Sequence, residues 1–126
     1  MNMFLAIAVG GAIGAVLRHA VSTGMYSWLG MGFPWGTLAV NVLGSLALGA
    51  VVEAGASTLK LTPELRALIA TGLLGAFTTF STFALDAANL FDRQAMISGI
   101  LYVGLSVSLC IGGFYLGAGG VRLALS

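Results

Sequence analysis

The sequence departs most clearly from an ordinary apolar helix in the stretch GLLGAFTTFSTF, residues 72–83. Two glycines, four hydroxyl side chains and three phenylalanines fall together there, in the middle of the third long apolar segment. Glycine weakens a helix, and the adjacent Thr78 and Thr79 are both β-branched. We therefore expect the third helix to be broken near its middle. The alternative is an unbroken helix whose hydroxyls bond back to the preceding turn.

A break at this position would have chemical consequences. It releases backbone carbonyl and N–H groups, which are tolerated deep in a membrane only inside protein or along a cavity. Freed carbonyls can bind a cation, whereas N–H groups and hydroxyls can hold an anion. Phe80 and Phe83 are three residues apart and share a face, so their positive ring edges could face a small anion. Plain packing of the two rings is the alternative.

The composition around this stretch indicates a membrane protein. Of 126 residues, five are Lys or Arg and four are Asp or Glu, so 7% are charged, against roughly 25% in soluble domains. Hydrophobic residues make up 59%, and the formal net charge is +1. These values exclude disorder, a nucleic-acid binder with a basic patch and most soluble enzymes. They predict an all-α membrane protein of closely packed helices, with no nucleic-acid partner.

Four apolar segments predict four transmembrane helices in a single transmembrane domain, residues 1–126. Thr62, Pro63 and Glu64 predict the start of the third, as N-cap, first-turn proline and favourable first-turn carboxylate. The expected spans are about 3–21, 36–52, 66–90 and 95–116, with loops at 22–34 and 54–60. Small residues four apart let helices approach closely. The pairs are Gly10 and Gly14, Ser45 and Gly49, Gly72 and Ala76, and Gly113 and Gly117.

The distribution of basic residues leaves the orientation in the membrane poorly specified. With four spans, Lys60, Arg66 and Arg122 lie on one side, and Arg18 and Arg93 lie on the other. Because the positive-inside rule then rests on a difference of one charge, the chain is expected to insert both ways up. Dual insertion suggests an antiparallel homodimer whose inverted symmetry arises between two copies.

Other polar side chains in the expected spans are few. Asn41 and Ser45 share one face of the second span, where a buried amide needs either a cavity or an interhelical hydrogen bond. Tyr102, Ser106 and Cys110 repeat every four residues in the fourth span. This weakly polar stripe suits a pathway or ordinary helix packing about equally well.

The remaining ionisable groups do not suggest catalysis. Asp86 lies near the end of the third span, and we expect it to pair with Arg18 or Arg66. His19, the sole histidine, lies beside Arg18 and is more typical of the membrane interface than of a catalytic Ser-His-Asp set. Because Cys110 is the sole cysteine, no internal disulfide or multi-cysteine metal site can form. We therefore expect that the protein is not an enzyme.

Three stretches resemble the Fluc (CrcB) family of fluoride channels. These are GGAIGAVLR at residues 10–18, GTLAVN at 36–41 and GAFTTFSTF at 75–83, of which the third is the most specific. Their order and spacing resemble the family over essentially the whole chain. The resemblance implies a multi-pass bacterial inner-membrane channel that exports fluoride passively and lowers its toxicity in the cytoplasm. It also implies an antiparallel, dual-topology homodimer with two pores, surrounded by lipid.

The same resemblance implies roles for individual residues. Gly75 and Thr78 would offer backbone carbonyls from both subunits to a structural sodium ion at the dimer centre. Arg18 matches a family arginine and is a candidate structural residue. The implied fluoride pore consists of Asn41, Phe80, Phe83, Ser81, Thr82, Tyr102 and Ser106. The sequence departs from the family pattern at Ala76, Ala84, Asp86 and Cys110, where glycine, serine, glutamate and a stronger donor are common.

Two other functions compete with a fluoride channel. A small four-helix multidrug or cation exporter also inserts both ways, but it needs a buried carboxylate as its proton and substrate site. The first expected span, residues 3–21, contains no carboxylate. A membrane scaffold without transport activity would not require the polar stretch in the third span.

Overall fold

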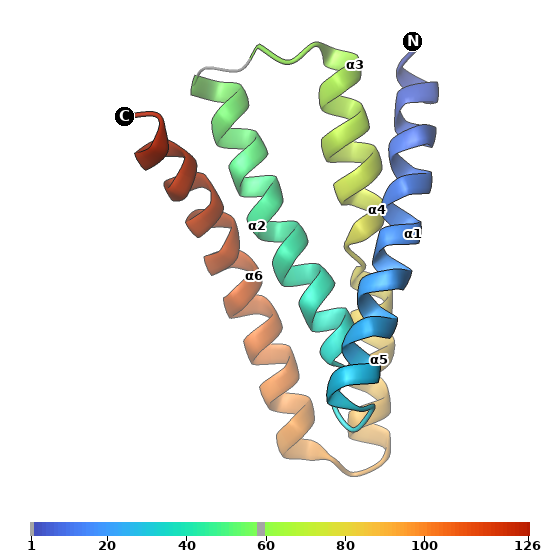
Figure 1. The fold of residues 1–126 in the computed structure, drawn as a ribbon. Coiled ribbons are helices and arrows are strands. Elements are labelled where there is room, and N and C mark those ends of the chain that lie inside the picture. Colours follow the sequence, from blue (N-terminus) through green and yellow to red (C-terminus); the bar gives the residue numbers. More distant parts are fainter. Residues whose placement is uncertain (1, 58–59) are drawn as a thin grey trace.

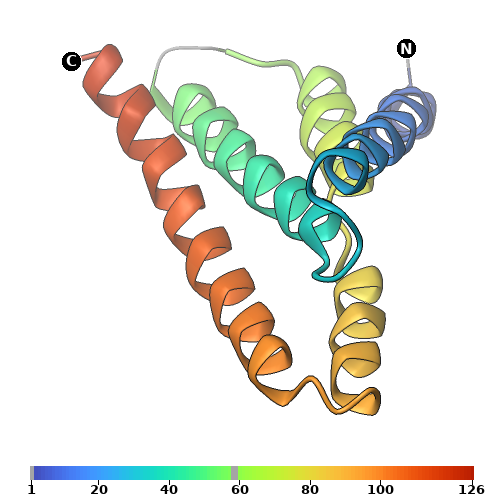
Figure 2. The same cartoon turned by 60° about the horizontal axis from the view of Figure 1, so that its bottom comes forward.

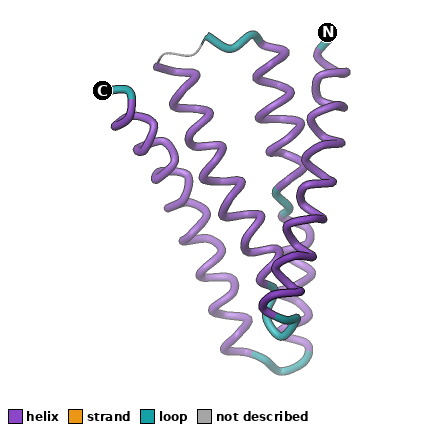
Figure 3. Tube along the Cα trace, viewed as in Figure 1, coloured by secondary structure: helices purple, strands orange, loops and turns teal. Residues whose placement is uncertain are grey.

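The computed structural model describes residues 2–57 and 60–126, and the regular elements in these ranges are all helical (Figure 3). Four helical rods are each long and apolar enough to cross a membrane. Three are single helices, and the third rod consists of four consecutive pieces (Figure 1). The elements are α1 (Met3–Leu29), α2 (Trp35–Ser57), α3 (Pro63–Arg66), η1 (Ala67–Leu74), α4 (Gly75–Phe77), α5 (Phe80–Asp92) and α6 (Met96–Ala124). The predicted all-α fold with a broken third helix is confirmed.

Three helices are longer than the spans expected from the sequence. The loop predicted at 22–34 is wrong over its first part, because α1 continues to Leu29. Nothing in this part breaks a helix before Gly30, which has φ 82° and donates its N–H to the Tyr26 carbonyl at 2.9 Å. The second loop is shorter than predicted because α2 continues to Ser57, and residues 58–59 of that loop lie outside the described residues. Likewise α6 continues past 116 to Ala124.

The third rod begins as predicted and then widens. Thr62 is the N-cap of α3, and its hydroxyl accepts the N–H of Leu65 at 3.1 Å. Pro63 occupies the first turn. From Ala67 to Leu74 the backbone forms a π-helix, with bonds to the fifth residue instead of the fourth. The sequence analysis did not predict this segment, which leads directly into the break.

The rods pack as two pairs, η1 against α1 and α2 against α6. Both chain termini lie at the end of the molecule where these pairs diverge (Figure 1). The opposite end is closed by α5, which packs against α6 and is set apart from the first half of its rod in the rotated view (Figure 2). A small apolar core, including the fully buried Tyr102 and Leu90 at 2% exposure, lies there.

Glycines make close backbone contact possible within each pair. A Cβ atom on Gly10 or Gly14 would lie 2.1 Å from a carbonyl oxygen of η1. A Cβ on Gly49 would lie 2.0 Å from the Phe114 carbonyl oxygen, and one on Gly117 would lie 2.0 Å from that of Leu46. No side chain fits at these distances, so the predicted role of these small residues in helix packing is confirmed.

Candidate functional site at the helix break

The third rod is interrupted at two consecutive threonines. Thr78 (φ −88°, ψ 158°) and Thr79 (φ −153°, ψ 115°) are extended and separate α4 from α5. The Thr78 N–H and hydroxyl both donate to the Leu74 carbonyl, at 3.1 and 3.0 Å, and complete the last helical turn. The break therefore falls at the β-branched pair and not at the glycines, because Gly72 and Gly75 both remain helical.

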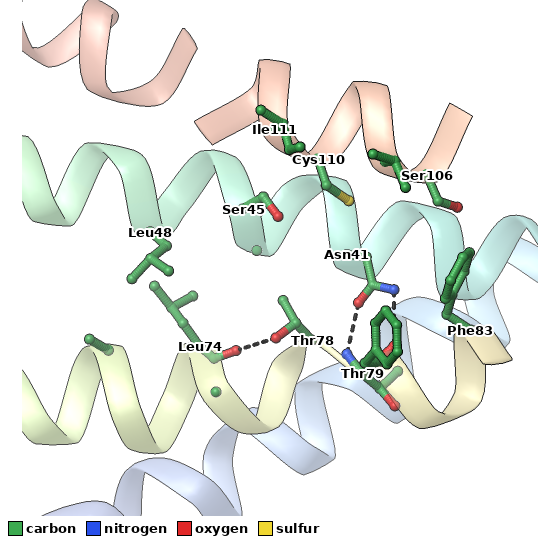
Figure 4. Close-up of a pocket in the computed structure, with 15 residues that line it drawn as sticks. Asn41, Ser45, Leu48, Leu74, Thr78, Thr79, Phe83, Ser106, Cys110 and Ile111 are labelled. Carbon is green, nitrogen blue, oxygen red and sulfur yellow. Dashed lines mark hydrogen bonds between the residues drawn. The ribbon is translucent and has the colours of Figure 1, made fainter. Parts of the chain in front are cut away.

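One side chain of the neighbouring helix α2 satisfies the backbone at the break. The Asn41 Oδ1 atom accepts the Thr79 N–H at 2.7 Å, and its Nδ2 donates to the Thr79 carbonyl at 3.1 Å (Figure 4). The amide thus makes the interhelical hydrogen bonds that were one of its two predicted alternatives. It also lines a cavity, which was the other. Sequence reasoning did not identify Thr79 as the partner of Asn41. The only feature of the sequence that pointed to Thr79 was the β-branched pair Thr78 and Thr79.

The second half of the rod begins with a cluster of hydroxyl groups. Thr79 is the N-cap of α5, and its Oγ1 accepts the Thr82 N–H at 3.2 Å. The same Oγ1 lies 3.1 Å from the Thr82 hydroxyl and 3.4 Å from the Ser81 hydroxyl. Hydroxyls and the positive end of a helix dipole therefore meet at the break, an arrangement that favours negative charge.

These substitute hydrogen bonds release particular carbonyl groups. In a continuous α-helix the N–H of Thr79 would donate to the Gly75 carbonyl, and the N–H of Thr82 to the Thr78 carbonyl. Here Asn41 and the Thr79 hydroxyl take those two N–H groups. The carbonyls of Gly75 and Thr78 lose their helical partners, as do those of Ala76 and Phe77, because α4 ends at Phe77 and α5 begins only at Phe80. No group of three His, Cys, Asp or Glu side chains suited to a metal occurs among the described residues.

A cavity of about 380 Å³ adjoins the break and brings together six of the predicted site residues. It lies between α2, η1, the break and α6 (Figure 4). The predicted residues that line it are Asn41, Gly75, Thr78, Phe80, Phe83 and Ser106, together with Ser45, Thr79 and Cys110. None of the described residues along it carries a charge. Ser106 is 6% exposed, and its hydroxyl has no hydrogen-bond partner among the described residues.

A second cavity, of about 260 Å³, lies beside the same break. Arg18, His19, Thr37 and Thr82 line it, and Thr79 lines both cavities. The structure thus separates Thr82 from the other predicted pore residues and places it near Arg18. Ser81 lines neither cavity, although its hydroxyl faces that of Thr79.

Aromatic rings lead from the first cavity into the core. The centroids of Phe80 and Phe83 are 5.4 Å apart, and those of Phe83 and Tyr102 are 5.2 Å apart. Phe80 is 80% exposed, whereas Tyr102 is fully buried and lines neither cavity. The ring row therefore runs from an open surface to a closed interior.

The carboxylate of Asp86 is held by hydroxyl groups. Its Oδ2 accepts from the Thr37 hydroxyl at 2.6 Å and from the Tyr102 hydroxyl at 3.2 Å. The predicted pairing with Arg18 or Arg66 is wrong, because α5 presents Asp86 to α2 and α6. Thr37 is a further residue that sequence reasoning missed. The one ion pair among the described residues joins Arg122 to Glu53 at 3.1 Å, near the chain terminus.

Fold and site together define a class of protein. Four helices able to cross a bilayer enclose a polar break that adjoins two cavities. Such a break is tolerated only where irregular backbone lines a cavity or is buried in protein. The molecule is therefore a multi-pass helical membrane protein with polar groups arranged inside it.

Comparison with known proteins gives the family. The family profile described as "CrcB-like protein, Camphor Resistance (CrcB)" matches residues 5–118. A fluoride-specific ion channel FluC of Rhodospirillum centenum is 44% identical over 126 residues, which is 100% of both chains. Proteins of the same name from Chelativorans sp. and Geobacter sulfurreducens are 47% and 44% identical over 117 residues, covering 93% of this chain and 94% of theirs. The chain belongs to the CrcB-like family. These relatives are named as channels, which does not favour the exporter alternative.

Proposed function

We propose that the protein is a passive, fluoride-selective channel and not an enzyme. The uncharged cavity beside the break carries this proposal, because it offers amide, hydroxyl and ring-edge groups without a charged side chain among its described residues. Its relatives are named fluoride-specific ion channels. A proton-coupled exporter would need a carboxylate in such a cavity. The single carboxylate near the break, Asp86, is instead bonded to Thr37 and Tyr102.

The polar groups in the cavity suit a small, strongly hydrated anion. The buried Ser106 hydroxyl has no partner within the described part of the chain and can donate to an ion in the cavity. The rings of Phe80 and Phe83 can present positive edges to the same space. These groups are weak enough individually to release the ion, which conduction requires. Both ends of the Asn41 amide hold the break, and the second hydrogen of its Nδ2 is left to donate to the ion.

The second cavity is suited to attract the anion toward the break. Arg18 supplies a positive charge there, and the Thr82 hydroxyl lies along the same wall. A cationic group in a recess raises the local concentration of anions without binding them tightly. Ser81 joins the hydroxyl cluster around Thr79 between the two cavities. Tyr102 contributes by fixing the Asp86 carboxylate in the closed interior.

A second copy in antiparallel orientation would complete the pathway. Phe80 is 80% exposed, and a large exposed aromatic ring at a polar break is unusual unless lipid or protein covers it. The nearly balanced basic residues, three on one side and two on the other, allow both insertions. We infer a dual-topology homodimer in which the break and Phe80 of each copy meet the other copy, giving two pores.

A structural sodium ion would suit the centre of this dimer. The carbonyls of Gly75 and Thr78 lose their helical partners, and carbonyl oxygen is a preferred ligand of hard cations. Two such carbonyls from each copy would provide four ligands. The same mode of binding, by unwound backbone inside a membrane protein, is used for sodium in transporters. The central cation would also offset the charge of anions in the pores.

The setting of this function would be the inner membrane of a bacterium. The four apolar helices fit a bilayer, and the relatives named above are bacterial channels. There the protein would let fluoride leave the cytoplasm and so lower its toxicity.

Fluoride efflux from liposomes that contain the purified protein tests the proposal. The liposomes are loaded with potassium fluoride, the membrane potential is dissipated with a potassium ionophore, and external fluoride is read with a fluoride electrode. A fast efflux that is absent from empty liposomes is expected. Absence of efflux, or equal efflux of chloride under the same conditions, would reject a fluoride-selective channel. Efflux that depends on a proton gradient would favour the exporter.

A further inference from the structure

The first cavity contains a thiol that the proposed function does not use. Cys110 is the sole cysteine of the chain and lines the cavity, where it is half-buried. Figure 4 shows its sulfur on the side of α6 that faces Asn41 and Ser45. A thiol in this position can be reached from the cavity, whereas thiols buried in an apolar core are inert.

A second observation indicates that the cavity holds a ligand next to this thiol. The Ser106 hydroxyl, one helical turn away on α6, is buried to 6% exposure and has no partner among the described residues. A buried hydroxyl without a partner costs about 1–3 kcal/mol of stability, so a water molecule or an ion beside it would be stabilising. Cys110 therefore lines a cavity beside a buried hydroxyl that still needs a polar partner.

We propose that Cys110 is a binding site for soft, thiophilic metal cations, of which Hg²⁺ is the probe, and that an occupied site blocks the pathway. The thiol exchanges its proton for the metal: the S–H bond breaks, an S–Hg bond forms, and the proton passes to water. No oxidant or reductant is needed. Thiolate sulfur selects soft cations over the hard sodium ion assigned to the backbone carbonyls, so the two cations do not compete for one site.

The block follows from the uncharged character of the cavity. A thiolate that holds Hg²⁺ places a fixed positive charge among lining residues that carry none. A pathway conducts only when each site releases its ion readily. A fixed cation would both narrow the cavity and retain an anion beside it. This inference rests on the proposed function for its effect on flux, although metal binding itself does not.

Efflux in chloride-free nitrate buffer tests the block. Micromolar mercuric nitrate is added to fluoride-loaded liposomes, and dithiothreitol is added afterwards. We expect the initial efflux rate to fall at least about tenfold and to recover with dithiothreitol, because thiolate–metal bonds are strong and exchangeable. The efflux rate of Cys110→Ser with mercury should stay within about twofold of its rate without mercury, because serine lacks the soft ligand. An unaffected wild type, or an equally inhibited Cys110→Ser, would overturn the proposal.

A matched variant separates a block in the cavity from a general effect of mercury. Leu123 lies near the end of α6, is 78% exposed and does not line the cavity. Leu123→Cys in the Cys110→Ser background should bind mercury without losing flux. Inhibition of this variant to the wild-type extent would contradict the assignment to Cys110.

Bound mercury, counted per chain by mass spectrometry after desalting, gives a readout that does not depend on flux. One mercury per wild-type chain and none in Cys110→Ser is expected. If mercury binds in this way but no protein carries fluoride, the proposed function fails and the metal site stands. If fluoride flows but no mercury is retained, the metal site fails and the channel stands.

Discussion

Where α1 packs on η1 and α2 packs on α6, the two helix backbones are in direct contact. At the break in the third rod, by contrast, the Asn41 side chain links the backbone of α2 to that of Thr79. In the first kind of contact the backbone hydrogen bonds remain within each helix, and close approach requires only that no Cβ atom lies between the helices. The second depends on Asn41 to complete hydrogen bonds that the helix cannot make. Glycine contacts therefore fix the position of the rods, and the break supplies the polar groups. Four substitutions test this division.

The largest effect is expected at a glycine contact. Gly117→Ala places a Cβ 2.0 Å from the Leu46 carbonyl oxygen, and α2 and α6 must separate to accept it. We expect a loss of about 3 kcal/mol, the upper range for overpacking, seen as a lower thermal unfolding midpoint in detergent. Gly119→Ala is the control, since nothing lies within 4 Å of its Cβ position. Equal midpoints for both variants would contradict the role of the α2–α6 contact.

Removal of the amide should have the next largest effect. Asn41→Ala leaves the Thr79 N–H and carbonyl without their partner, and we expect about 2 kcal/mol of destabilisation, since an unsatisfied buried group costs about 1–3 kcal/mol. Asn41→Asp keeps the acceptor for the N–H but adds a negative charge to the cavity. If the cavity conducts an anion, this variant should lose efflux even where it remains folded. Normal efflux by folded Asn41→Asp would remove the cavity from the pathway.

Substitution of Phe80, at the open end of the cavity, should lower fluoride efflux without lowering the stability of the fold. Phe80 is 80% exposed and contributes little to packing within one chain. Phe80→Ile removes the positive ring edge, and we expect efflux to fall about tenfold, which corresponds to about 1.4 kcal/mol and to the upper range of an aromatic contact. Because isoleucine keeps an apolar side chain at the proposed dimer contact, the unfolding midpoint should stay near that of the wild type. Unchanged efflux would exclude Phe80 from the pore.

The smallest effect, a loss of stability, is expected from removing one of the hydroxyl groups that bind the Asp86 carboxylate. Thr37→Val removes one hydrogen bond to the carboxylate with little change in shape, and we expect a loss of about 1 kcal/mol. The Tyr102 hydroxyl remains as a partner. Thr37→Ser, which retains the hydroxyl, should unfold close to the wild type in the same thermal assay. A larger loss from Thr37→Ser than from Thr37→Val would show that packing, and not the hydrogen bond, matters here.

Local signals in the sequence predicted the parts of the fold that depend on local chemistry. The cap at Thr62 and the break within residues 72–83 follow from residue types and their immediate neighbours. The close contacts of Gly10 and Gly117 follow from spacing along one helix. Each of these features is decided within one or two helical turns, so the printed sequence contains the necessary information.

The parts that sequence reasoning missed depend on contacts between distant segments. Asn41 and Thr79 are 38 residues apart, and only the packing of α2 against the third rod joins them. The partners of Asp86 depend in the same way on how α5 is turned after the break. A loop was expected from residue 22, yet α1 continues to Leu29 because nothing before Gly30 ends the helix. The pore assignments of individual residues remain predictions for the flux experiments.

Thr79 lines both cavities, and this has an electrical consequence. If the two cavities fill with water from opposite sides of the membrane, a membrane voltage falls little along them and concentrates on the protein between them. At Thr79 a single residue borders both cavities. An ion passing it would exchange about 2.3 kcal/mol per 100 mV with the field within a few ångströms. The extended threonine would then act as the thinnest insulating layer of the protein.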